Sequence, residues 1–203
     1  MNILVVAPHP DDEAIGCGGS ICLHVERGDR VVAVFLTSGE LGLKHLAPGQ
    51  AWEIREREAR RSGLILGLSG LHFLRQADWY LGQGKRKAVT ALRPIIESEA
   101  PAIIYLPHPL EWHPDHKASL AIVRTALGEF KKPTLRGYEV WTPLAEFDQV
   151  TDISQVMSRK LRALRAHASQ FAEFDYAHAV RGLNQYRGAL GGKCAYAEVF
   201  QTL

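Results

Sequence analysis

The chain has 203 residues, 46% of them hydrophobic and 23% charged, and its formal net charge is +2 at pH 7. This composition is typical of a folded domain with a sizeable core, and the nearly balanced charge gives no reason to expect nucleic acid or an anionic membrane as a partner. The apolar run over residues 1–7 has no basic segment before it and is followed at once by titratable residues, so we expect neither a signal peptide nor a membrane span there. Three cysteines form no CxxC pair, and we expect buried, reduced thiols in a cytoplasmic protein. They are Cys17, Cys22 and Cys194.

Short apolar runs alternate with segments of helical periodicity along the first 130 residues. The runs predict strands at residues 2–7, 31–37, 71–74 and 101–106, and the periodic segments predict helices at 12–27, 52–66, 87–99 and 114–127. Four strand–helix pairs in succession predict an α/β fold, with a Rossmann-like open, mostly parallel sheet and helices on both faces. The later part is less regular, with a strand expected at 136–141, a helix at 153–167 opened by Asp152, and a final strand at 196–200. No repeat or long linker divides the chain, so we expect a single domain over residues 1–203.

Titratable residues gather where the predicted strands end. The first strand is followed by the sequence PHPDDE at 8–13, the second by TSGE at 37–40, and the fourth by PHP at 107–109 and EWHPDH at 111–116. Because ligands bind beyond the carboxyl ends of the strands in sheets of this kind, these segments are expected to meet at one site.

Two imidazoles and a carboxylate form the best candidate metal site. His9 and Asp12 are three residues apart at a strand-to-helix turn, and His116 arrives from the loop after the fourth strand. This set suits Zn²⁺ and leaves one coordination position for water, as catalytic zinc sites do. His113, three residues before His116, is a competing ligand, and spacing alone does not choose between them. The other histidines are expected to be structural or solvated: His24, His45, His72, His108, His167 and His178.

Asp11 and Asp12 are adjacent, so their side chains should diverge and only one should bind the metal. The other carboxylate can remove a proton from a water whose pKa the metal lowers, as that water attacks a carbonyl. His113 suits the role of a donor to the resulting oxyanion. Asp115 either holds the second nitrogen of His113 or caps the helix after Pro114, or does both.

With these residues the chain resembles the LmbE-like (PIG-L) deacetylases, which are zinc enzymes that act on substrates containing N-acetylglucosamine. The resemblance covers essentially the whole chain and is carried by several separate motifs. They are PHPDDE at 8–13, GCGG at 16–19, TSGE at 37–40, Arg55 and Glu58 ahead of Leu66-Gly67, HPDH at 113–116, Ser169-Gln170, Arg181-Gly182 and YAEVF at 196–200.

The resemblance implies an LmbE-like fold and a role for each residue of the site. The zinc ligands would be His9, Asp12 and His116, the general base Asp11, and the residue that stabilises the oxyanion or protonates the leaving amine His113, with Asp115 as its partner.

For substrate binding, the resemblance makes Arg55 the residue that grips the substrate and Asp78 the acceptor of a sugar hydroxyl. Glu40 is a further candidate contact, and Trp112 either stacks on a sugar ring or walls the pocket. Some relatives carry a mobile tyrosine two residues before the first histidine of HPDH. Here that position is Glu111, which puts a tyrosine-assisted step in doubt.

We therefore expect a zinc-dependent hydrolase that removes the acetyl group from an N-acetylglucosamine-type sugar or small sugar conjugate, with Fe²⁺ as an alternative metal. The expected partner is the small N-acetylated sugar, without nucleic acid or membrane, and a homo-oligomer stays open. The alternatives are another metal-dependent hydrolase and a catalytically inactive sugar-binding relative. A facial-triad iron oxygenase fits less well, because those triads usually occur on all-β scaffolds.

Overall fold

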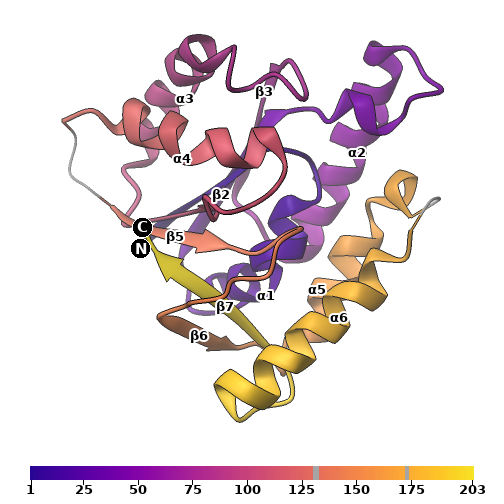
Figure 1. Cartoon of the computed structure of the whole chain (residues 1–203), viewed down its shortest axis with the longest axis vertical. Helices are drawn as coiled ribbons and strands as arrows, with labels where there is room; N and C mark the ends of the chain where they lie inside the picture. Colours follow the sequence, from indigo (N-terminus) through magenta and orange to yellow (C-terminus); the bar gives the residue numbers. More distant parts are fainter. Residues whose placement is uncertain (130–132, 172–173) are drawn as a thin grey trace.

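A computed structural model describes residues 1–129, 133–171 and 174–203 (Figure 1). In this part of the chain seven strands form one sheet in the order β3-β2-β1-β4-β5-β7-β6. The strands are β1 (Asn2–Ala7), β2 (Arg30–Thr37), β3 (Gly70–Gln76), β4 (Ile103–Pro107), β5 (Thr134–Tyr138), β6 (Gln149–Asp152) and β7 (Ala197–Thr202). The α-helices are α1 (Asp12–Glu26), α2 (Pro48–Leu66), α3 (Lys85–Glu99), α4 (Pro114–Leu127), α5 (Met157–Arg165) and α6 (Tyr176–Arg187). Short helical turns are η1 (Glu40–Gly42), η2 (Ala168–Gln170) and the π-helical η3 (Gly188–Gly192).

The sheet is parallel from β3 to β5, and β7 joins it antiparallel to both β5 and β6. The prediction of an open, mostly parallel α/β sheet is thus confirmed. The chain starts in the middle of the sheet, builds outwards through β2 and β3, and then returns to place β4 on the other side of β1. The strand order therefore reverses between β1 and β4, and this is where ligands bind in sheets of this class.

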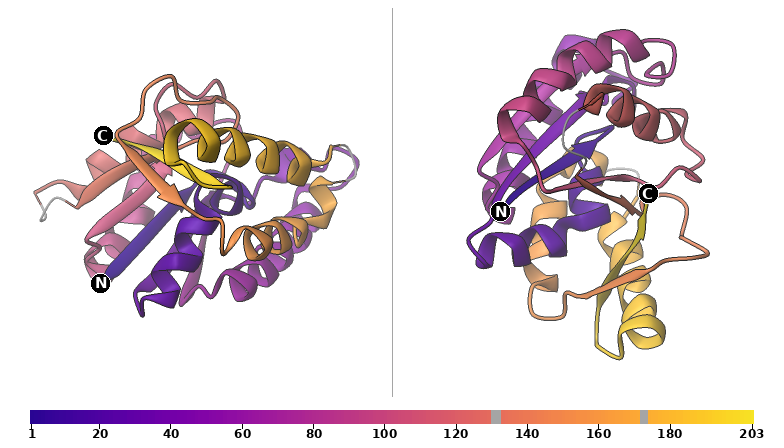
Figure 2. Two further views of the ribbon diagram at one scale, coloured as in Figure 1. Left: turned by 90° about the horizontal axis from the view of Figure 1, so that it is seen from below. Right: turned by 90° about the vertical axis from the view of Figure 1, so that its left-hand side faces the viewer.

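The strand β1 is apolar from Ile3 to Ala7 because this stretch is buried on both faces. Ile3, Val5 and Ala7 belong to one core, which they share with α1, α2, α5 and α6. Leu4 and Val6 belong to a second core, formed with α3 and α4. Figure 1 shows these two groups of helices on opposite sides of the sheet, and Figure 2 shows α5 and α6 beside α2. Such two-sided burial is why a parallel strand has a continuous apolar sequence.

The boundaries differ from prediction where tertiary contacts set them. The helix expected at 52–66 begins at Pro48, which occupies the first turn, and the Gln50 side chain accepts a hydrogen bond from the Ala47 N–H. The helix expected at 153–167 covers only Met157–Arg165, because Asp152 lies in β6. Neither β6 nor α6 was predicted. Among the described residues, no helix is long and apolar enough to cross a membrane.

The strand expected at 136–141 ends at Tyr138 because a buried side chain takes over its backbone donors. The carboxylate of Glu111 accepts hydrogen bonds from the N–H groups of Val140, Trp141 and Thr142, at 2.8–3.2 Å. These groups consequently form a turn around one carboxylate instead of a ladder with a neighbouring strand.

Candidate active site

A cavity of about 560 Å³ opens beyond the carboxyl ends of β1 and β4. One wall comes from the turn between β1 and α1, and another from the residues that lead into α4. The loops after β2, β3 and β5, Arg55 of α2, Gln170 of η2 and the start of α6 complete the lining. Segments far apart in the sequence meet here, as expected from the sheet topology.

Three donor atoms form a triangle with equal sides at this cavity, where His9 and Asp12 are lining residues and His116 is fully buried. His9 Nδ1 lies 3.3 Å from Asp12 Oδ2, His116 Nε2 lies 3.3 Å from the same oxygen, and the two histidine nitrogens are 3.3 Å apart. Ligands at the usual zinc distances of roughly 2.0–2.1 Å in a tetrahedron are about 3.3–3.4 Å from one another. The spacing of the donor set therefore fits a tetrahedral ion.

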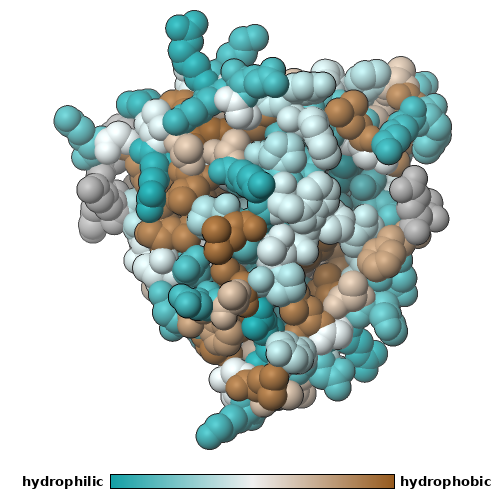
Figure 3. Space-filling view, viewed as in Figure 1, coloured by the Kyte–Doolittle hydropathy of each residue, from teal (hydrophilic) through white to brown (hydrophobic). Residues whose placement is uncertain are grey.

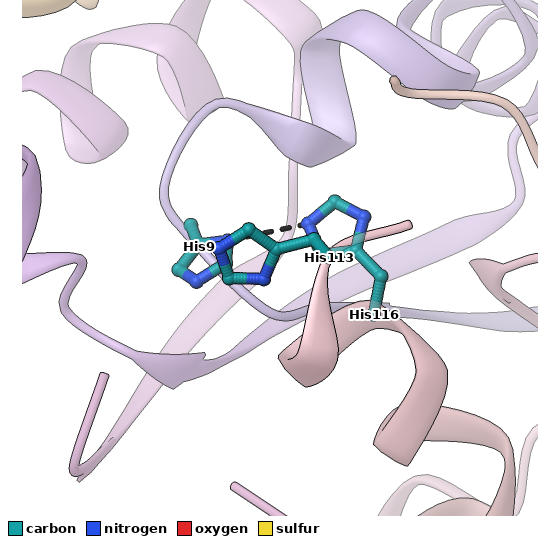
Figure 4. Close-up of side chains that lie close together, drawn as sticks. All are labelled: His9, His113 and His116. Carbon is teal, nitrogen blue, oxygen red and sulfur yellow. Dashed lines mark hydrogen bonds between the residues drawn. The ribbon is translucent and has the colours of Figure 1, made fainter. Parts of the chain in front are cut away.

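His113 is close enough to compete for this position, and Figure 4 shows its ring beside those of His9 and His116. Its Nδ1, however, accepts a hydrogen bond of 3.3 Å from the N–H of Asp115, because His113 is the N-cap of α4. The accepting nitrogen carries no proton, so in the neutral ring Nε2 is the protonated donor. In its neutral form His113 is therefore a hydrogen-bond donor, and Asp12 offers the third atom of the triangle with His9 and His116.

His9, Asp78 and Asp115 form a second group of possible metal ligands, in which both carboxylates lie at the Nε2 end of the His9 ring. His9 Nε2 lies 3.0 Å from Asp78 Oδ1 and 3.2 Å from Asp115 Oδ2. A carboxylate on Nε2 fixes the proton there and turns the Nδ1 lone pair toward Asp12 and His116. The remaining oxygens accept N–H donors from Leu41 and Leu81, at 3.0 Å each. Asp78 and Asp115 are consequently partners of a ligand.

The placement of Asp115 corrects two expectations. Its carboxylate accepts hydrogen bonds from His9, Trp79 and Leu81, and only its backbone N–H reaches His113. It does not cap α4 either, because Pro114 occupies the first helical position and makes the preceding His113 the cap.

The electrostatics of the cluster favour a cation. Burial by itself lowers the pKa of His9, but hydrogen bonds to Asp115, Asp12 and Asp78 raise it well above 6.5. Burial also lowers the pKa of His116, while the charge of Asp12 raises it to about 9. For Asp12, burial raises the pKa and the two histidines lower it far below its usual range. The negative charge that holds these histidine protons would also attract a metal ion, whose binding would displace the protons.

Asp11 diverges from Asp12 and has an unusual backbone. Its φ is 123° and its ψ is −29°, in a region that costs on the order of 1–3 kcal/mol for a residue with a side chain. Its N–H donates to Glu13 Oε2 at 3.0 Å, and its carboxylate accepts from Arg55 Nη2 at 3.1 Å. Burial raises the pKa of Asp11 to about 6, against the opposing charge of Arg55. A carboxylate with such a pKa suits a general base near neutral pH.

Arg55 is buried and tied to the protein. Its Nη1 donates to the carbonyl of Gly39 at 2.8 Å and its Nη2 to that of Pro10 at 2.6 Å, besides the contact with Asp11. It therefore joins the loops after β1 and β2 and orients the Asp11 carboxylate. It also lines the cavity, as expected of a residue near the substrate.

The other predicted substrate residues divide into two kinds. Asp78 and Trp112 line the cavity, and Trp112 is 55% exposed. Glu40 is not among the lining residues, and its Oε1 accepts the N–H of Asp78 at 3.0 Å. Glu40 thus positions Asp78.

His167, which we expected to be structural or solvated, is buried and structural, but sequence reasoning did not identify its partner. Its Nε2 lies 3.2 Å from Glu13 Oε1, which also accepts from Ser62 Oγ at 3.0 Å. Glu13 in turn holds the strained backbone of Asp11. No local signal reveals this contact, because 154 positions separate His167 from Glu13. Trp141 and Tyr176, which also line the cavity, were missed for the same reason.

The chain is similar to several known proteins. Residues 4–127 match the family model described as PIG-L, GlcNAc-PI de-N-acetylase. The chain is 34% identical over 193 residues to a diacetylchitobiose deacetylase of Thermococcus kodakarensis, covering 85% of this chain and 71% of that protein. It is 31% identical over 191 residues to a probable N-acetyl-α-D-glucosaminyl L-malate deacetylase 2 of Bacillus anthracis, covering 84% and 82%. The structure of N,N′-diacetylchitobiose deacetylase from Pyrococcus horikoshii superposes with a TM-score of 0.87 at 25% identity, covering 99% of this chain and 83% of that one.

The chain therefore belongs to the PIG-L (LmbE-like) family, which confirms the resemblance drawn from its motifs. It is an enzyme of the deacetylase class.

Proposed function

We propose that this chain, as one domain over residues 1–203, hydrolyses the acetamide of an N-acetylglucosamine-type sugar and releases acetate and a free amine. The observation that carries the proposal is the equal-sided triangle of His9, Asp12 and His116 with the Asp11 carboxylate beside it. Two relatives are named as deacetylases of diacetylchitobiose and of a GlcNAc–malate conjugate, and these names support the same reaction. We expect the enzyme to be cytoplasmic.

The proposed metal is Zn²⁺, held by His9 Nδ1, Asp12 Oδ2 and His116 Nε2. The same two-histidine, one-carboxylate set also suits Fe²⁺. When bound, such an ion supplies Lewis acidity, which polarises the amide carbonyl and lowers the pKa of water. Asp78 and Asp115 keep His9 in the ligating tautomer.

Asp11 acts as the general base. It takes a proton from the attacking water while the water oxygen bonds to the carbonyl carbon, and that proton later goes to the sugar nitrogen as the C–N bond breaks. Arg55 keeps the Asp11 carboxylate turned toward the cavity. The neutral ring of His113 donates its Nε2–H to the carbonyl oxygen as negative charge develops there. Burial, followed by the charges of His9 and His116, lowers the pKa of His113 to about 4, in agreement with a neutral ring.

The sugar is proposed to lie between Asp78 and Trp112. Asp78 lines the cavity beside His9, and its carboxylate can accept a hydrogen bond from a sugar hydroxyl. The indole of Trp112 offers a flat apolar face to the sugar ring. Arg55 at the cavity floor is the proposed contact for the acetamido sugar.

The test is amine release from a panel of N-acetylglucosamine conjugates, with protein stripped by chelation and reloaded with zinc. Asp11→Asn and His116→Ala should each abolish turnover, and His113→Ala should lower kcat by about 10²- to 10³-fold, the usual loss for one oxyanion donor. Glu129→Gln, an exposed carboxylate far along the chain, is the matched control and should be fully active. A protein that binds zinc but releases no amine from any N-acetyl sugar would contradict the proposal.

A further inference from the structure

Three aromatic side chains extend the cavity away from His113, and we call them the aromatic strip: Trp112, Trp141 and Tyr176. The ring centroid of Trp112 is 5.5 Å from that of His113 and 6.3 Å from that of Trp141, and Trp141 is 5.6 Å from Tyr176. All three line the cavity. They come from the loop before α4, the loop after β5 and the first residue of α6, so only the fold assembles them.

The strip is held in place by the buried carboxylate of Glu111. Glu111 is fully buried and accepts the backbone N–H of Trp141 at 3.0 Å and that of Thr142 at 3.2 Å. The hydroxyl of Thr142 in turn accepts the N–H of Trp112 at 3.3 Å. One carboxylate thus fixes the backbones of both tryptophans while their side chains stay 55% and 41% exposed. Rings fixed before binding lose little conformational entropy when a ligand covers them.

The aromatic faces of the strip select against an anionic ligand. Among the described residues, Arg55 and Lys44 are the Lys and Arg side chains that line the cavity, and neither belongs to the strip: Arg55 is engaged by Asp11 and two carbonyls, and Lys44 follows η1. The strip itself presents aromatic faces, whose negative π clouds attract the C–H edge of a ring and repel an anion. The face seen in Figure 3 carries pale residues of intermediate hydropathy over its centre, with brown hydrophobic residues in separate places around them.

We propose that the aromatic strip is a second binding subsite, an inference that rests on the proposed function. The N-acetylglucosamine places its acetamide at His113, and the strip binds an uncharged ring that is linked to this sugar. The substrate class is therefore a disaccharide or a ring-bearing glycoside. A conjugate with a carboxylate-bearing group such as malate fits this wall poorly. Trp112, between His113 and Trp141, borders both rings, and Trp141 is the residue that determines this preference.

The experiment compares kcat/KM for four substrates: N-acetylglucosamine, N,N′-diacetylchitobiose, an aryl N-acetylglucosaminide and the N-acetylglucosamine–malate conjugate. The zinc-loaded enzyme should prefer the two ring conjugates to both others, and the disaccharide and aryl arms show which kind of ring the strip takes. Trp141→Leu should lower the ratio of kcat/KM for the preferred ring conjugate over that for the monosaccharide by about tenfold, mainly through KM, and Trp141→Phe should restore most of it. Tyr186→Leu, an exposed aromatic residue outside the cavity, is the control and should leave the ratio unchanged.

Preference for the malate conjugate, or equal losses on every substrate in Trp141→Leu, would overturn the subsite. Absence of turnover on all four substrates would instead overturn the proposed function, and the strip is then tested by binding alone. In Asp11→Asn, tryptophan fluorescence should saturate with the preferred ring conjugate at concentrations where the malate conjugate has no effect, and Trp141→Leu in that background should weaken this binding. Equal binding of both conjugates would overturn the subsite independently of catalysis.

Discussion

Replacing Asp11 by glycine should give a more stable protein than replacing it by alanine. At φ 123° and ψ −29°, a residue with a Cβ costs on the order of 1–3 kcal/mol, and glycine does not. Glycine in turn lowers the free energy of unfolding by about 0.4–1 kcal/mol relative to alanine, because it gives the unfolded chain more conformational entropy. Both variants remove the carboxylate and leave Arg55 without that partner, so this loss cancels in the comparison.

From the middle of each range the net difference is about 1.3 kcal/mol in favour of glycine, which for a chain of this length is about 3–5 °C in Tm. We would measure thermal unfolding of both variants by circular dichroism in the presence of a chelator. The control is the same pair at Arg57, an exposed position inside α2, where alanine should be the more stable by about 1 kcal/mol. An Asp11→Ala protein as stable as Asp11→Gly, with the expected order at Arg57, would refute strain at Asp11.

Three further predictions concern metal, core and pH. Removing the metal with a chelator should lower Tm by about 5–10 °C, because an ion at 100-fold its Kd stabilises the folded state by about 2.7 kcal/mol; an unchanged Tm on stripping and reloading would contradict the metal site. Lys160→Met should destabilise the protein by about 3–5 kcal/mol in urea, because it leaves Glu198, 2.7 Å from Lys160, as an unpaired buried charge, whereas exposed Arg162→Met should change little. Burial lowers the pKa of His24, so the unfolded chain binds the proton better and stability is lost as pH falls below about 6.5. Between pH 7.5 and 5.5, the wild type should lose more free energy of unfolding than His24→Gln, and equal losses would contradict the lowered pKa.

The sequence by itself determined the order of strands and helices in the first 127 residues. The information there is local: β1 is apolar because both of its faces are buried, and the glycine at position 28 ends the first helix with φ 80°. The motifs at the ends of β1 and β4 were equally visible, because in a parallel sheet the residues after a strand lie where ligands bind. His9, Asp12 and His116 could therefore be placed at one cavity without coordinates.

Only the tertiary structure decided what each polar side chain contacts there. Sequence spacing left His113 and His116 equivalent as ligands, and the helix cap that engages His113 Nδ1 separates them. It also could not show that the Asp115 carboxylate faces His9 across 106 positions, or that Glu111 ends β5 early and holds Trp141. Such contacts depend on distances and directions in three dimensions, and neither periodicity nor residue type records them. The local pattern therefore determined the sheet and the edge that carries the site, and the packing of distant loops decided the partners of each residue within it.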